Sequence, residues 1–123
     1  MNNKDSQIIR HILKYCNKIE CTVSRFGADA AVFTADPDYR DSIAMNLLQI
    51  GELAGKLSPE YIRSSSQNWR AIKNMRNMFA HDYGSMDIDR IWDTAILDIP
   101  ELKNYCREEL QSKGESLPLI DEL

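Results

Sequence analysis

The chain has 123 residues, a formal net charge of −4, 43% hydrophobic residues and 28% charged residues. These values fit one globular domain and exclude a disordered chain, which would carry fewer apolar residues. No apolar stretch approaches the roughly 20 residues of a membrane-spanning helix, and the N-terminus lacks the apolar segment of a signal peptide. Three cysteines without a CxxC pair favour free structural thiols over a disulfide framework or a zinc site. We therefore expect a cytoplasmic protein.

Helical spacing of apolar residues begins close to the N-terminus. It predicts a helix over about residues 5–20, with Asp5 or Ser6 as its N-cap. A second short helix is predicted over residues 22–33, although its β-branched residues are weak helix formers. Pro37 is then expected to stop the helical pattern in a turn.

A clear helix is predicted from about Tyr39 to Leu57. Its small residues Gly51, Ala54 and Gly55 allow another helix to approach closely, either from the same chain or from a second subunit. The sequence Ser58–Glu60 then predicts a short capped turn with proline in the first helical position.

The C-terminal part predicts two further helical stretches. Asp87 is the expected N-cap of the first, and Pro100 predicts a kink or a restarted helix. Lys113-Gly114 is expected to end the regular structure, which gives a helical domain over residues 1–112 and a tail over 113–123. Because no segment alternates with a period of two, we predict an all-α, up-and-down bundle of four to six helices.

The most informative stretch is residues 69–83, which follow a polar connector over residues 64–68. We predict that this stretch forms one helix. Its buried stripe is predicted to contain Trp69, Ile72, Met75, Phe79 and Tyr83. The opposite face collects Arg70, Asn74, Asn77 and His81. Arg76 lies at the edge of the stripe, where a charged guanidinium needs a partner or a function. The stretch 61–81 contains no carboxylate, and a local basic patch in an acidic chain indicates a nucleic-acid contact.

The sequence contains neither a recognisable metal-ligand set nor a glycine-rich nucleotide loop, so we expect no metal and no cofactor. Arg76 and His81 could instead cleave RNA: histidine transfers protons near neutral pH, and arginine holds phosphoryl oxygens. A single His81 per chain is few for two proton transfers, and Arg76 and His81 diverge on an ideal helix, so a homodimer that shares its sites fits better. On composition and spacing alone, a helix that merely exposes a basic face is the favoured alternative.

Residues 76–83, Arg-Asn-Met-Phe-Ala-His-Asp-Tyr, resemble the Arg-x4-His-x-Tyr motif of the HepT-like toxins, a branch of the HEPN superfamily (higher eukaryote and prokaryote nucleotide-binding). The resemblance spans roughly residues 5–110. It includes Ile50-Gly51-Glu52, Leu57-Ser58-Pro59-Glu60, Trp69, Ile91-Trp92 and Ile99-Pro100-Glu101-Leu102. The serine-rich run before Trp69 departs from this pattern, and residues 22–37 match weakly.

This resemblance implies a dimeric helical bundle with metal-independent endoribonuclease activity, the toxin of a toxin–antitoxin system. Arg76 and His81 would be catalytic and Asn77 supporting, and Arg70, Lys73 and Asn74 are further candidates for RNA binding. The implied partner is a small nucleotidyltransferase antitoxin that transfers AMP to Tyr83 and silences the nuclease. From the residues alone, Tyr83 would be read as closing the core.

Two other interpretations stay open at this point. The first is a catalytically quiet HEPN module that binds a nucleotide or a protein, with a nucleotidyltransferase as its main partner. The second is a plain helical scaffold in which Arg76 forms a structural ion pair.

Overall fold

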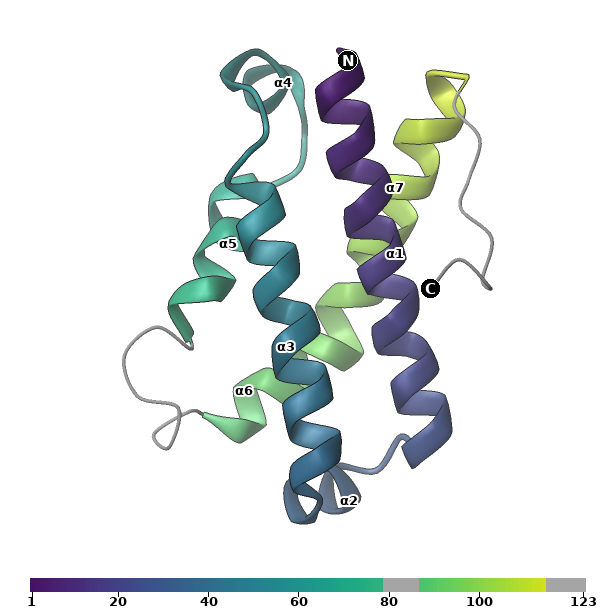
Figure 1. The fold of residues 1–123 in the computed structure, drawn as a ribbon, viewed down its shortest axis with the longest axis vertical. Coiled ribbons are helices and arrows are strands. Elements are labelled where there is room, and N and C mark those ends of the chain that lie inside the picture. Colours follow the sequence, from purple (N-terminus) through teal and green to yellow (C-terminus); the bar gives the residue numbers. More distant parts are fainter. Residues whose placement is uncertain (79–86, 115–123) are drawn as a thin grey trace.

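The computed structural model describes residues 1–78 and 87–114, and the regular structure in these two ranges is helical (Figure 1). The elements are α1 (Asn3–Phe26), α2 (Ala30–Ala35), α3 (Pro37–Ala54), α4 (Pro59–Ser64), α5 (Trp69–Lys73), the 3-10 helix η1 (Asn74–Met78), α6 (Ile88–Asp93), the π-helical turn η3 (Thr94–Asp98) and α7 (Ile99–Ser112). Since η1 continues α5 and η3 joins α6 to α7, the described ranges form six helical units, which confirms the predicted all-α bundle. None of the helices in these ranges is long and apolar enough to cross a membrane.

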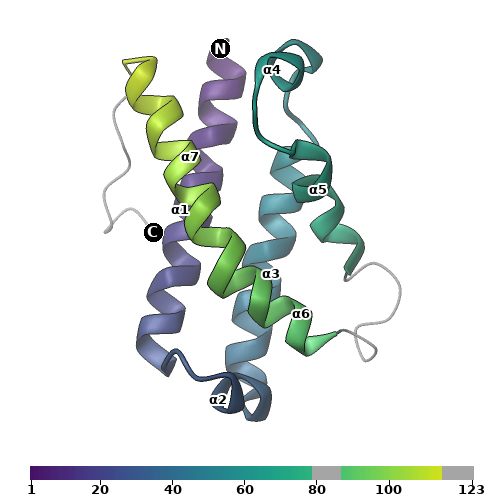
Figure 2. The ribbon, with the colours of Figure 1, turned by 180° about the vertical axis from the view of Figure 1, so that it is seen from behind.

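The core lies between α1, α3 and α7. Figure 1 shows α1 and α3 side by side, and Figure 2 shows α7 crossing α1 on the opposite side. Side chains with at most 1% exposure fill this space; they include Ile9, Ile12, Leu13, Cys16, Ile19, Ile43, Leu47, Ile50, Ile99, Cys106 and Leu110. The three cysteines are free, as predicted, and burial raises the pKa of the Cys16 thiol to about 12. Cys16 is therefore an apolar packing group rather than a reactive one.

The predicted N-cap of the first helix is wrong. Asn2 caps α1 instead, since its side-chain oxygen accepts a hydrogen bond from the Asp5 backbone N–H at 2.7 Å. Asp5 is only 1% exposed and serves another segment: its carboxylate accepts hydrogen bonds from the Ser58 N–H at 2.9 Å and the Ser58 hydroxyl at 2.6 Å. Ser58 in turn caps α4, as predicted. Asp5 thus fixes the turn that follows α3.

We predict that Asp5→Ala lowers the free energy of unfolding by about 2–3 kcal/mol, because two hydrogen bonds to a buried charged group are lost. Asp5→Asn keeps one acceptor oxygen in place and should lose less. Urea denaturation followed by circular dichroism measures both values. Equal unfolding midpoints for the wild type and Asp5→Ala would contradict this role.

The predicted helix over residues 22–33 is also wrong, whereas the helical pattern does stop before Pro37, since α2 ends at Ala35. Helix α1 continues to Phe26, where Gly27 with φ 107° ends it, and α2 follows as a separate helix. Asp36 is the only residue between α2 and α3, and its side chain caps α3. Pro37 also begins α3, because its fixed φ and missing N–H suit the first helical position.

In the C-terminal part, Asp87 caps α6 as predicted, since its side chain accepts a hydrogen bond from the Arg90 N–H at 3.1 Å. The predicted interruption near Pro100 takes the form of the π-helical turn η3, directly before α7. A proline removes one helical N–H and its ring crowds the carbonyl of the fourth residue before it, which favours a widened turn. Helix α7 ends at Ser112, and most of the predicted tail, residues 115–123, lies outside the described ranges.

Candidate active site

The start of α5 is held by a hydrogen-bonded aromatic cluster. Asn68 caps the helix, since its side-chain oxygen accepts a hydrogen bond from the Ala71 backbone N–H at 3.2 Å. The buried Trp69 indole N–H donates to the Ser65 hydroxyl at 2.9 Å, and that hydroxyl lies 2.5 Å from the Tyr105 hydroxyl. Tyr105 is bonded to Tyr61 at 2.8 Å, and burial together with this bond raises the Tyr61 pKa, which keeps that phenol neutral. The Ser65 hydroxyl thus anchors the serine-rich connector to Trp69 and Tyr105.

The predicted continuous helix is wrong after Lys73, where the backbone tightens into the 3-10 helix η1. The predicted burial is confirmed for the part of the stripe that is described, namely Trp69, Ile72 and Met75. A 3-10 helix has three residues per turn and therefore a narrower cross-section than an α-helix. The narrow section includes Arg76, which contacts Gly51 of α3.

This contact depends on Gly51. A Cβ atom added to Gly51 would lie 2.9 Å from the backbone nitrogen of Arg76 and 3.3 Å from its Cβ. One turn later, a Cβ at Gly55 would lie 3.6 Å from Lys73 Cε and 3.7 Å from Arg76 Nη1, which is ordinary contact. The small-residue patch therefore packs against the candidate site within the same chain at Gly51.

Arg76 lies along the C-terminal end of α3. Its Nη1 is 4.0 Å from Glu52 Oε1, and both side chains are partly exposed, Arg76 by 39% and Glu52 by 49%. Lys73 shares the surface beside Gly55, so the structure brings two of the predicted cations together. The other described members of the predicted polar face, Arg70, Asn74 and Asn77, are exposed on α5 and η1.

Glu52 is a site residue that the basic-patch argument missed, because that argument considered one stretch of the chain and the carboxylate comes from another helix. The available signal was its neighbour Gly51, one of the small residues that predicted a close helix approach. His81 and Tyr83 fall within residues 79–86, outside the described ranges, so their place relative to Arg76 stays a prediction.

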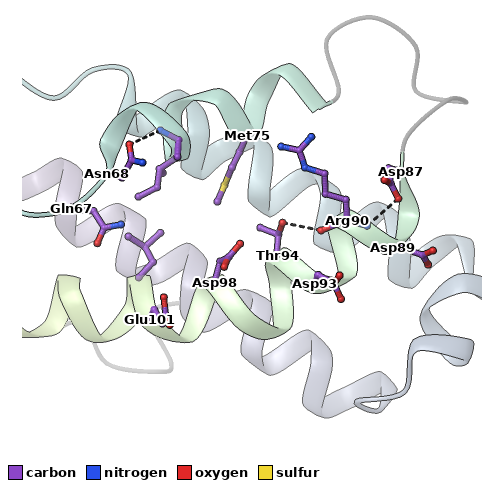
Figure 3. Close-up of a pocket in the computed structure, with 13 residues that line it drawn as sticks. Gln67, Asn68, Met75, Asp87, Asp89, Arg90, Asp93, Thr94, Asp98 and Glu101 are labelled. Atoms are coloured by element: carbon purple, nitrogen blue, oxygen red, sulfur yellow. Dashed lines mark hydrogen bonds between the residues drawn. The ribbon is translucent and has the colours of Figure 1, made fainter.

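A cavity of about 600 Å³ lies on another side of α5 and η1, facing α6, η3 and α7 (Figure 3). Ile72 and Met75 contribute to its lining. Its polar wall carries one cation, Arg90, and the carboxylates of Asp87, Asp89, Asp93, Asp98 and Glu101. This excess of negative charge repels phosphate, so the exposed basic face near Arg76 suits a nucleic acid better. In the described parts of the chain, no three His, Cys, Asp or Glu side chains gather as a metal site.

Comparison with known proteins identifies the family. The family model described as "Ribonuclease HepT-like" matches residues 12–109. The chain belongs to the HepT-like ribonuclease family. A protein of Caldanaerobacter subterraneus subsp. tengcongensis, named "Putative RNase", is 31% identical to it over 107 residues, which cover 85% of this chain and 93% of the relative. No solved structure matches the chain.

The HepT-like range extends from within α1 to within α7 and therefore contains the whole α3–η1 contact. The resemblance proposed from residues 76–83 and their flanks is confirmed at the level of the family. For a HepT-like ribonuclease, RNA is the substrate class that the family indicates. The exposed cations of α5 and η1 provide a surface with the matching charge.

Proposed function

We propose that the protein is a metal-independent endoribonuclease, the toxin of a toxin–antitoxin pair, with Arg76 and His81 as catalytic residues. The observation that carries the proposal is the position of Arg76 in a HepT-like chain: it is partly exposed beside Lys73 on a narrow helix packed against α3. The ion pair with Glu52 is too weak to give Arg76 a mainly structural role. At 4.0 Å and this exposure, such a pair contributes at most about 1 kcal/mol to stability.

In the proposed reaction, the ribose 2′-hydroxyl attacks the adjacent phosphorus. The O2′–P bond forms, the P–O5′ bond breaks, the 2′-hydroxyl gives up its proton, and the leaving 5′-oxygen gains one. His81 acts in proton transfer. Arg76 stabilises the negative charge that develops on the phosphoryl oxygens, assisted by Lys73 and the polar side chain of Asn77.

The proposal includes a homodimer in which the two copies of the motif share a cleft. Two proton transfers then draw on two copies of His81. Mixed dimers that combine Arg76→Ala and His81→Ala chains test this sharing, since one composite site should regain activity if residues act across the interface.

Incubation of the purified protein with RNA, with and without a chelator, tests the proposed chemistry. We expect cleavage that the chelator leaves unchanged, and products with a 2′,3′-cyclic phosphate and a 5′-hydroxyl end. End-group analysis by mass spectrometry measures the products. Loss of activity on chelation, or a 5′-phosphate product, would show a different mechanism.

The proposed regulation concerns Tyr83, two residues after His81. An AMP group on its hydroxyl would bring a phosphate and a bulky nucleoside near the cations that RNA needs. We expect co-expression with a cognate nucleotidyltransferase to add one or more AMP groups to Tyr83 and to abolish cleavage. Intact-mass analysis measures the adduct, with Tyr83→Phe as the control that folds but escapes modification. An equal adduct on Tyr83→Phe would place the modification elsewhere.

A further inference from the structure

The backbone and the first side-chain atoms of Arg76 are fixed by α3. The contact at Gly51 leaves no room for even one carbon atom, so the backbone of η1 cannot shift toward α3 at this point. The guanidinium is less constrained, because several side-chain torsions separate it from this contact. Its direction therefore depends on what surrounds the end of the side chain.

Two features attract the guanidinium to the C-terminal end of α3. The helix has 18 residues, and its last carbonyl groups carry the negative end of the helix dipole. The Glu52 carboxylate lies 4.0 Å from Arg76 Nη1. Both attractions point the guanidinium along α3 instead of into the solvent.

We propose that Glu52 is a positioning residue that orients the Arg76 guanidinium for contact with the RNA phosphate. This inference rests on the proposed ribonuclease function and deepens it. The ion pair is too exposed to matter much for stability. Its effect on the cleavage rate can still be large, because a displacement of about 1 Å in a catalytic group can lower the rate about 100-fold.

Glu52 also has an opposite effect, since its negative charge repels the phosphate that Arg76 attracts. The two effects appear in different kinetic constants. Loss of orientation lowers kcat, while loss of repulsion strengthens RNA binding and lowers KM. A residue with only a structural role would instead lower the melting temperature together with the activity.

Steady-state cleavage of a short RNA by three variants separates these effects. Glu52→Gln keeps the shape and removes the charge, so we expect kcat to fall about tenfold, with KM unchanged or lower and an unchanged melting temperature. Glu52→Asp keeps the charge but shortens the reach, so kcat should fall without a decrease in KM. Glu108→Gln changes an exposed carboxylate on α7 and should behave as the wild type. An unchanged or increased kcat in Glu52→Gln overturns the inference.

A second measurement does not depend on activity. The side-chain Nε–H signal of Arg76, assigned by its loss in Arg76→Lys, reports the mobility of the guanidinium by NMR relaxation. We expect a lower order parameter in Glu52→Gln than in the wild type and no change in Glu108→Gln. If the order parameter is unchanged, Glu52 does not position Arg76, whatever the enzyme does. If it falls but the wild type cleaves no RNA, the positioning is correct and the proposed function is wrong.

Discussion

Replacement of Arg76 or His81 by alanine is expected to reduce RNA cleavage by at least about 100-fold without unfolding the protein. Arg76 is partly exposed, and its ion pair with Glu52 is long, so the fold loses little when the side chain is removed. The cleavage rate falls much more than the stability, because the preorganised charge that stabilises the phosphoryl oxygens disappears. Single-turnover cleavage gives the rate, and thermal melting followed by circular dichroism gives the stability.

Two further variants make this comparison specific. Arg107 is an exposed arginine on α7, so Arg107→Ala removes the same charge away from the proposed site and should leave cleavage unchanged. Arg76→Lys keeps the charge but loses the planar fork of the guanidinium, and we expect an intermediate rate. Full activity in His81→Ala would exclude this histidine from the reaction.

The parts of the fold that the sequence predicts well are those that neighbouring residues determine. The apolar spacing along α3, the cap at Ser58 and the cap at Asp87 each depend on a few adjacent positions, and all three are confirmed. Asp5 shows the limit of this approach. Its chemistry suits an N-cap, yet its partner is Ser58, and 53 positions separate the two residues.

Pro37 shows a second limit, because a proline can end one helix or begin the next and local spacing does not decide between them. The α3–η1 contact likewise joins segments that are far apart in the sequence. For the same reason, the acidic wall of the cavity was not predicted: its carboxylates are spread over α6, η3 and α7, and folding gathers them.

At the candidate site, the sequence correctly placed Arg76 at the edge of the buried stripe and exposed Arg70, Asn74 and Asn77. It also indicated that Arg76 needs a partner or a function. What it could not give was the surface on which Arg76 lies, since that surface belongs to α3. Gly51 and Gly55 were identified only as permitting a close approach.

The two glycines supply the most discriminating structural test of the site. We expect Gly51→Ala to lower the free energy of unfolding by about 1–3 kcal/mol, as overpacking of a close contact does. The new methyl group would meet a backbone nitrogen, which cannot rotate away, so η1 has to move and takes Arg76 with it. Cleavage should therefore fall about tenfold or more.

Gly55→Ala is the matched control, one turn further along α3. There the added methyl group would lie 3.4 Å from the backbone oxygen of Glu52 and 3.6 and 3.7 Å from the ends of two flexible side chains, all ordinary contact distances. The backbone conformation, φ −67° and ψ −13°, also accepts alanine. We expect a stability within about 0.5 kcal/mol of the wild type, or slightly above it, and cleavage close to wild type. Urea denaturation and single-turnover cleavage measure both variants. Equal effects at the two positions would mean that α3 does not hold the backbone of Arg76, whereas a loss confined to Gly51→Ala makes the α3–η1 contact part of the catalytic geometry.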